Sequence, residues 1–83
     1  MSKNQKQHYI IQFSEKGEWI DCYWAGMNNY TDQWRKAKMY NSTRYAHEAA
    51  HDAMKRVVKT ADSYRLIIVE IYQTGVIEAD GNN

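Results

Sequence analysis

The segment HEAAH, residues 47–51, has the residue types and spacing of a catalytic metal site. Its pattern is His-Glu-x-x-His, in which two imidazoles share one face of a helix and can bind one Zn²⁺, while the glutamate acts as a general base. A catalytic zinc also needs a third protein ligand and an open coordination position. The question is whether the rest of the chain supplies that third ligand.

The surroundings of the motif do not complete a zinc site. The longer peptidase motif continues with a glycine and a third histidine, and this chain has Met54 and Val57 at those positions. Asp52 is charged where those enzymes usually have an apolar residue. Glu70 is expected in a strand, on the sheet face away from the helix, and His8 falls in the first predicted strand. We therefore predict no metal and no cofactor, and we interpret both histidines as flanking residues of an Ala-rich helix. A zinc peptidase is kept as a remote alternative.

Other chemical signatures are missing from the sequence as well. The single Cys22 falls in a predicted strand, where a buried thiol is usually inert. The glycines are isolated, so no Gly-rich phosphate loop is present, and no serine sits in a nucleophile elbow. We therefore predict that the protein is not an enzyme.

Composition indicates one small globular domain over residues 1–83, with flexible ends at 1–7 and 80–83. A net charge of +1 is too low for non-specific binding to nucleic acid. A single cysteine, a polar N-terminus (MSKNQKQ) and apolar runs well short of the roughly 20 residues of a membrane span favour a cytoplasmic protein without membrane association. Seven Tyr and three Trp are many for such a thin core, so some of these rings should lie on the surface.

The spacing of apolar residues predicts the element order β-β-β-α-β. Strands are expected at residues 8–14, 19–25, 34–40 and 64–73. A loop is expected at 26–33, and 76–79 either extends the last strand or adds a short one. A helix capped by Asn41 or Ser42 should cover 43–61. The predicted fold is α+β: a small antiparallel or mixed four-stranded sheet with one helix packed on one face.

Strand alternation divides the sheet residues between two faces. The set expected in the core beneath the helix is Tyr9, Ile11, Phe13, Ile20, Cys22, Trp24, Ala37, Met39, Ile67, Val69 and Ile71. The opposite set is Ile10, Gln12, Trp19, Asp21, Tyr23, Lys36, Lys38, Tyr40, Leu66, Ile68, Glu70 and Tyr72. From the helix, Val57 is expected to pack with Val69, Ile11 and Phe13.

The second set mixes aromatic rings with charges, which is typical of an interaction surface. We predict partner contacts at Trp19, Tyr23, Lys36, Lys38, Tyr40 and Tyr72. One reading is a protein partner, including a second copy of the chain. A second reading is single-stranded nucleic acid stacked on the rings, with the lysines and Arg35 near the backbone. The carboxylates of Asp21 and Glu70 on this face favour protein. A third reading is that the rings merely stiffen a two-sided sheet.

A longer pattern suggests an origin. The segment WRKAKMYNSTRYA (34–46), followed by an amphipathic helix and YRLIIVEI, is similar to small uncharacterised proteins encoded by bacteriophages and prophages. Those proteins share an aromatic hairpin, a Trp, Ala-Lys-x-aromatic-x-Ser before a helix, and a final hydrophobic strand. The similarity covers residues 8–73 and is a pattern of spacing rather than a defined family, with Tyr45-Ala46 where Glu-Ala is common. It implies a phage or mobile-element accessory protein that binds and inhibits a host protein in the host cytoplasm.

Overall fold

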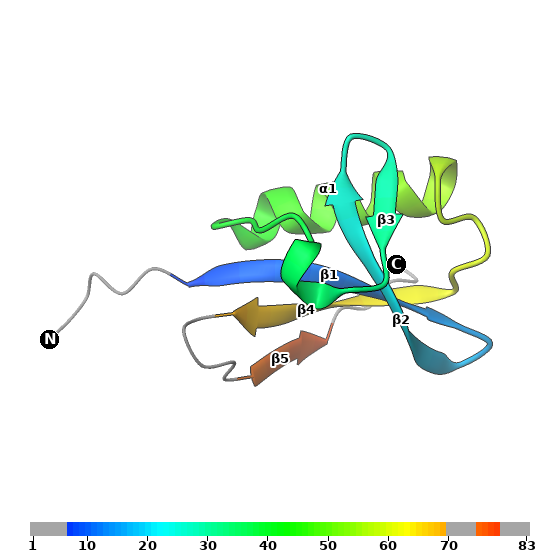
Figure 1. Cartoon of the computed structure of the whole chain (residues 1–83), viewed down its shortest axis with the longest axis horizontal. Helices are drawn as coiled ribbons and strands as arrows, with labels where there is room; N and C mark the ends of the chain where they lie inside the picture. The colour runs from blue at the N-terminus through cyan, green and yellow to red at the C-terminus, as the bar shows by residue number, and fades with distance from the viewer. Residues whose placement is uncertain (1–6, 70–74, 79–83) are drawn as a thin grey trace, which may run out of the picture.

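The computed structural model describes residues 7–69 and 75–78, and it shows an antiparallel sheet with a helix packed against it (Figure 1). The strands are β1 (His8–Glu15), β2 (Glu18–Gly26), β3 (Asn29–Thr31), β4 (Ser63–Val69) and β5 (Gly75–Glu78). Their order across the sheet is β3-β2-β1-β4-β5, and every neighbouring pair is antiparallel. The predicted α+β class is therefore confirmed, and the 76–79 segment corresponds to the short separate strand β5.

Several sequence predictions concern residues beyond those described. The ends expected to be flexible, 1–7 and 80–83, lie outside the described residues except for Gln7. The same holds for the last part of the predicted 64–73 strand, which includes Glu70, Ile71 and Tyr72. These predictions stay predictions.

Helix α1 (Thr43–Arg56) begins where the sequence predicts and ends earlier. The Ser42 hydroxyl accepts the Tyr45 backbone N–H at 3.4 Å and caps the first turn. At the other end the backbone N–H groups of Val57 and Val58 both donate to the Ala53 carbonyl, at 2.8 Å each, and the chain then turns. This turn buries the Val58 side chain, which a helix continuing to 61 would place elsewhere. Among the described residues, no helix combines the length and apolar character that a membrane span needs.

The helix packs on the sheet through small residues. Ala46, Ala50 and Ala53 are fully buried, so the helix backbone can approach the strands closely. The buried residues of this first cluster are Ile11, Phe13, Cys22, Trp24, Ala46, Ala50, Ala53, Val58, Tyr64 and Leu66. Tyr9 and Ile20 pack against it as partly buried residues. The faces predicted for β1 and β2 are therefore correct.

The face predicted for β4 is wrong. Tyr64 and Leu66 lie beneath the helix, whereas Ile67 and Val69 pack on the opposite face. β4 is apolar on both faces, so alternation alone does not set its phase, and a shift of one residue exchanges the faces. Val57 packs partly buried against the first cluster, so the predicted packing of Val57 with Val69 is also wrong.

The third predicted strand, 34–40, is mostly not a strand. β3 instead lies at Asn29–Thr31, inside the predicted loop, because the hairpin turn is very tight. Met27 and Asn28 have φ values of 55° and 64°, which give the backbone twist of a two-residue hairpin turn. Methionine is rare in this conformation, so the sequence gives little sign of the turn.

The chain after β3 forms a 3₁₀ turn, η1 (Trp34–Lys36), and then runs extended. The Lys38 N–H donates to the Trp24 carbonyl at 2.9 Å, and Tyr9 and Tyr40 exchange two backbone hydrogen bonds of 2.7 and 2.8 Å. This return segment covers part of the second sheet face. The second cluster consists of Ile10, Tyr23, Ala37, Ile67 and Val69, with Trp34 packed against it.

The tip of the β2–β3 hairpin lies beside the C-terminal end of α1 (Figure 1). There Arg56 donates to the Asn28 side chain at 3.3 Å and also bonds Asp52. The hairpin therefore bends toward the helix, away from the second sheet face.

Asp62 fastens the β1–β2 turn to the start of β4. Its carboxylate accepts the Ser14 hydroxyl at 2.6 Å and the Gly17 backbone N–H at 3.0 Å, and its own N–H donates to the Ser14 carbonyl at 2.9 Å. The Ser14 hydroxyl and then the Gly17 N–H lower the pKa of Asp62 below its ordinary value.

We predict that Asp62 makes stability depend on pH in the acid range. Because its pKa is lower in the folded state, the ionised carboxylate stabilises the fold above the unfolded-state pKa of about 4, and this stabilisation is lost as pH falls through the folded-state pKa. Asp62→Asn should therefore lower Tm at neutral pH, and the difference from wild type should shrink on acidification. Circular-dichroism melts across the acid range measure this, and Ser14→Ala should behave similarly. Parallel curves for wild type and Asp62→Asn would contradict the prediction.

Candidate binding surface

Both histidines of the HEAAH segment contact one buried tyrosine. The His47 Nδ1 lies 2.6 Å and the His51 Nε2 3.3 Å from the Tyr64 hydroxyl, and both rings meet the Tyr64 ring edge-on. Tyr64 is 2% exposed, beneath the helix. A hydroxyl can donate to one imidazole nitrogen and accept from the N–H of the other, so the pair satisfies a buried polar group. His47 and His51 have the spacing of a metal-ligand pair, but here they connect α1 to β4 through Tyr64.

The remaining motif residue lies apart from this contact. Glu48 is exposed and forms an ion pair with Arg44 at 3.5 Å. Among the described residues, no three His, Cys, Asp or Glu side chains gather as a group that could hold a metal ion. The segment therefore has a structural explanation that needs no chemistry, while the predicted lack of a metal requirement stays a prediction.

Two of the predicted contact residues lie on the sheet face opposite α1. Trp19 and Tyr23 alternate along β2 with Asp21 between them, and Trp19 is 36% exposed. Tyr23 is only 7% exposed because it belongs to the second cluster, so its expected exposure is wrong. Lys36 is exposed on η1, and Tyr72 lies outside the described residues.

The other two predicted contact residues lie toward the helix side. Tyr40 packs against the first cluster, and its hydroxyl accepts the Trp24 indole N–H at 3.0 Å. The Lys38 ammonium lies 5.5 Å from the Tyr40 ring centroid, and the Lys38 stem runs close to Gly26. The predicted strand at 34–40 would have placed Lys38 and Tyr40 on the face opposite α1. The extended return segment places them on the helix side instead. The predicted surface is therefore divided.

Arg65, which was not among the predicted contact residues, stacks on Trp19. The Arg65 guanidinium lies 4.4 Å from the Trp19 ring centroid, and its Nε donates to the Gln12 carbonyl oxygen at 2.9 Å. Gln12 is buried, and its amide donates to the Ile20 backbone carbonyl at 2.9 Å. Correct phasing of β4 would have revealed Arg65, because its Cα is paired with that of Gln12.

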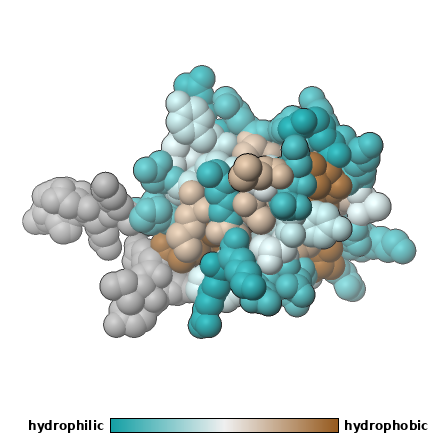
Figure 2. All heavy atoms as spheres, turned by 45° about the horizontal axis from the view of Figure 1, so that its top comes forward, coloured by the Kyte–Doolittle hydropathy of each residue, from teal (hydrophilic) through white to brown (hydrophobic). Residues whose placement is uncertain are grey.

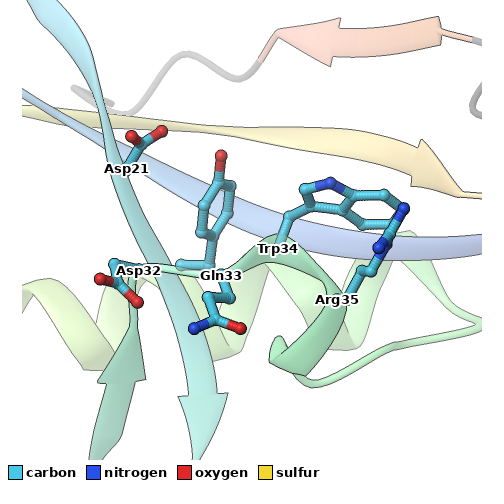
Figure 3. Close-up of a pocket in the computed structure, with 6 residues that line it drawn as sticks. Asp21, Asp32, Gln33, Trp34 and Arg35 are labelled. Carbon is cyan, nitrogen blue, oxygen red and sulfur yellow. The ribbon is translucent and has the colours of Figure 1, made fainter.

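A pocket of about 380 Å³ opens beside Tyr23 (Figure 3). Its lining residues are Asp21, Tyr23, Asp32, Gln33, Trp34 and Arg35. Figure 3 shows the Asp21 and Asp32 carboxylates on one side and Trp34 with Arg35 on the other. The Arg35 guanidinium lies 5.3 Å from the Trp34 ring centroid. Asp32, Gln33 and Trp34 were missed because the sequence placed them in a loop and in a third strand.

Tyr23 and Asp21 lie together at the edge of this pocket. Burial, followed by the negative charge of Asp21, raises the pKa of the Tyr23 hydroxyl. The Asp21 carboxylate is therefore close enough to act on this hydroxyl through its charge.

We call the residues Trp19, Asp21, Tyr23, Asp32, Trp34, Arg35 and Arg65 the far-face strip. It joins rings to charges of both signs, and it lies opposite α1. Elsewhere the surface is mixed: on the face drawn in Figure 2, apolar residues form separate areas among hydrophilic ones. The far-face strip is the surface on which aromatic rings are held by polar partners, and it is our candidate site.

We predict that the Tyr64 hydroxyl contributes to stability. Tyr64→Phe leaves both imidazoles without their buried partner and should lower the free energy of unfolding by about 1–2 kcal/mol in urea titrations. Tyr45→Phe is the matched control, because Tyr45 is exposed and lies on α1 near the two histidines. A Tyr64→Phe variant as stable as wild type would show that the contact is unimportant. A wild-type Tm that falls on addition of a chelator would instead indicate a bound metal.

Comparisons with known proteins do not assign the chain to a family. No family model, no curated protein and no solved structure matches it. Function must therefore be argued from the geometry of the described residues.

Proposed function

We propose that this protein is a non-enzymatic binding module that contacts another protein through the far-face strip. The observation that carries the proposal is the Trp19–Arg65–Gln12 arrangement. The Trp19 indole is about one third exposed and is stacked by the Arg65 guanidinium, which also donates a hydrogen bond to the buried Gln12 side chain. Tryptophan and arginine are the residue types that most often dominate protein interfaces, and holding them in place before binding reduces the entropy lost on association.

The charges of the strip support a protein partner over nucleic acid. The carboxylates of Asp21 and Asp32 offset the positive charges of Arg35 and Arg65, so the strip offers a phosphate backbone little net attraction. The lysines expected to steer such a backbone are not gathered beside Trp19, since the Lys38 ammonium lies by Tyr40. A strip with rings and charges of both signs is better suited to a polypeptide surface.

The partner we propose is a host-cell protein or a second copy of this chain. This agrees with the role expected of a phage or mobile-element accessory protein that acts as an inhibitor in the cytoplasm. Both kinds of partner would use the same strip.

We predict that Trp19→Ala weakens association by about 2 kcal/mol or more, because it removes the exposed ring that Arg65 stacks on. Sedimentation over a concentration series measures self-association, and cross-linked capture from a bacterial lysate followed by titration measures a foreign partner. Tyr45→Ala is the matched control, since Tyr45 is an exposed ring on the helix side and should leave affinity unchanged. Circular dichroism checks that each variant is folded.

Three outcomes would contradict the proposal. Loss of binding in Tyr45→Ala with full binding in Trp19→Ala would move the interface to the helix side. An affinity that falls steeply with salt, together with capture of nucleic acid, would favour the single-stranded nucleic-acid reading. Unfolding of Trp19→Ala would mean that this ring serves the core.

A further inference from the structure

We infer that the pocket beside Tyr23 receives the cationic side chain of a lysine or arginine from the partner polypeptide. This inference deepens the proposed function and rests on it, because the pocket is part of the far-face strip. It names the chemical group that the partner must present.

The path of the chain builds the pocket. β2 supplies Asp21 and Tyr23, and the segment after β3 returns across the same face with Asp32 to Arg35. Trp34 is anchored against the second cluster, so its ring is a fixed wall. The volume of about 380 Å³ is at the lower end of pockets that hold a ligand group, and it suits one long side chain.

The carboxylates of the pocket have no cationic partner among the described side chains. The ion pairs among the described residues are Arg44–Glu48 and Arg56–Asp52, and both lie on the helix. Asp21 and Asp32 are both at exposed positions, so their carboxylate oxygens are accessible to a donor. Figure 3 shows Asp21 and Asp32 on the same side, away from Arg35. A cation entering between them would meet two carboxylates.

The aromatic walls favour the same group. A lysine or arginine places an apolar stem before its charge, and the Tyr23 and Trp34 rings can pack against such a stem. A guanidinium can also stack on a ring while it donates to a carboxylate, so arginine should bind more tightly than lysine. The lining holds two carboxylates and one guanidinium, that of Arg35, so its net charge favours a cation over an anion.

Continuity with the rest of the strip favours a polypeptide over a free small molecule. The pocket is open to solvent, so it would enclose only part of a ligand. Trp19 lies on the same face of β2 as Asp21 and Tyr23, two residues before Asp21. The Arg65 guanidinium stacks on its ring. A partner whose basic side chain fills the pocket would therefore extend over the Trp19–Arg65 stack.

The test uses blocked tripeptides in which arginine, lysine, glutamate or norleucine is flanked by glycines. Each is titrated into the ¹⁵N-labelled protein at low salt, and two-dimensional NMR follows the backbone signals of the pocket residues and the Trp34 indole N–H. We expect millimolar binding in the order arginine, lysine, then no binding of glutamate or norleucine. The Asp21→Asn, Asp32→Asn double variant should raise the Kd of the arginine peptide about fivefold or more. Glu48→Gln is the matched control on the helix and should leave it unchanged.

The outcomes separate this inference from the proposed function. Equal binding of the norleucine and arginine peptides, unchanged affinity in the double variant, or absence of shifts at the pocket would overturn the inference. Trp19-dependent association with a protein would still stand in each case. Conversely, selective arginine binding that is lost in the double variant supports the inference, and association that is indifferent to Trp19→Ala would then count against the proposed interface alone. Because both Asn substitutions are nearly isosteric and at exposed positions, the variant should keep the wild-type spectrum elsewhere.

Discussion

The described part of the chain has one α-helix for a sheet that is apolar on both faces, and most of the structure follows from this constraint. Ile10 and Ile11 are neighbours on the central strand, point to opposite faces, and are both fully buried. The helix covers only the face of Ile11. The segment that returns from β3 must therefore cover the other face, and it does so with Trp34 and Ala37. The pocket beside Tyr23 is a consequence of this return path, and the Trp19 end of the strip remains partly exposed.

On the helix side, a motif with the residue types of a metal site serves packing instead. The alanines of α1 allow a close approach to the sheet, which brings the hydroxyl of Tyr64 beneath the helix. A hydroxyl buried there costs free energy unless it is bonded, and His47 and His51 supply the partners. Histidines four positions apart on one helix face can thus both reach one tyrosine. The far-face strip and the helix lie on opposite faces of the same sheet.

The sequence predicts which face of an element is buried where only one face is apolar. Where both faces are apolar, it does not distinguish them. The faces of β1 and β2 and the cap at Ser42 could be predicted from pattern and capping chemistry. The phase of β4 could not, because Leu66 and Ile67 are equally apolar; the neighbouring Arg65 was the available signal. Within the candidate site, Trp19 was found from alternation. Tyr40 was assigned to the wrong side because the tight turn at Met27 moved the third strand upstream.

The assignment of residues to the two faces is the claim on which the rest depends, and nuclear Overhauser contacts between side chains test it most directly. We predict contacts from the Trp34 indole to the methyl groups of Ile10 or Ile67, and from Leu66 methyl groups to the methyl of Ala50. Contacts from Ile67 to Ala50, with Leu66 near Trp34, would invert β4. That result would remove Arg65 from the Trp19 ring and with it the basis for the far-face strip.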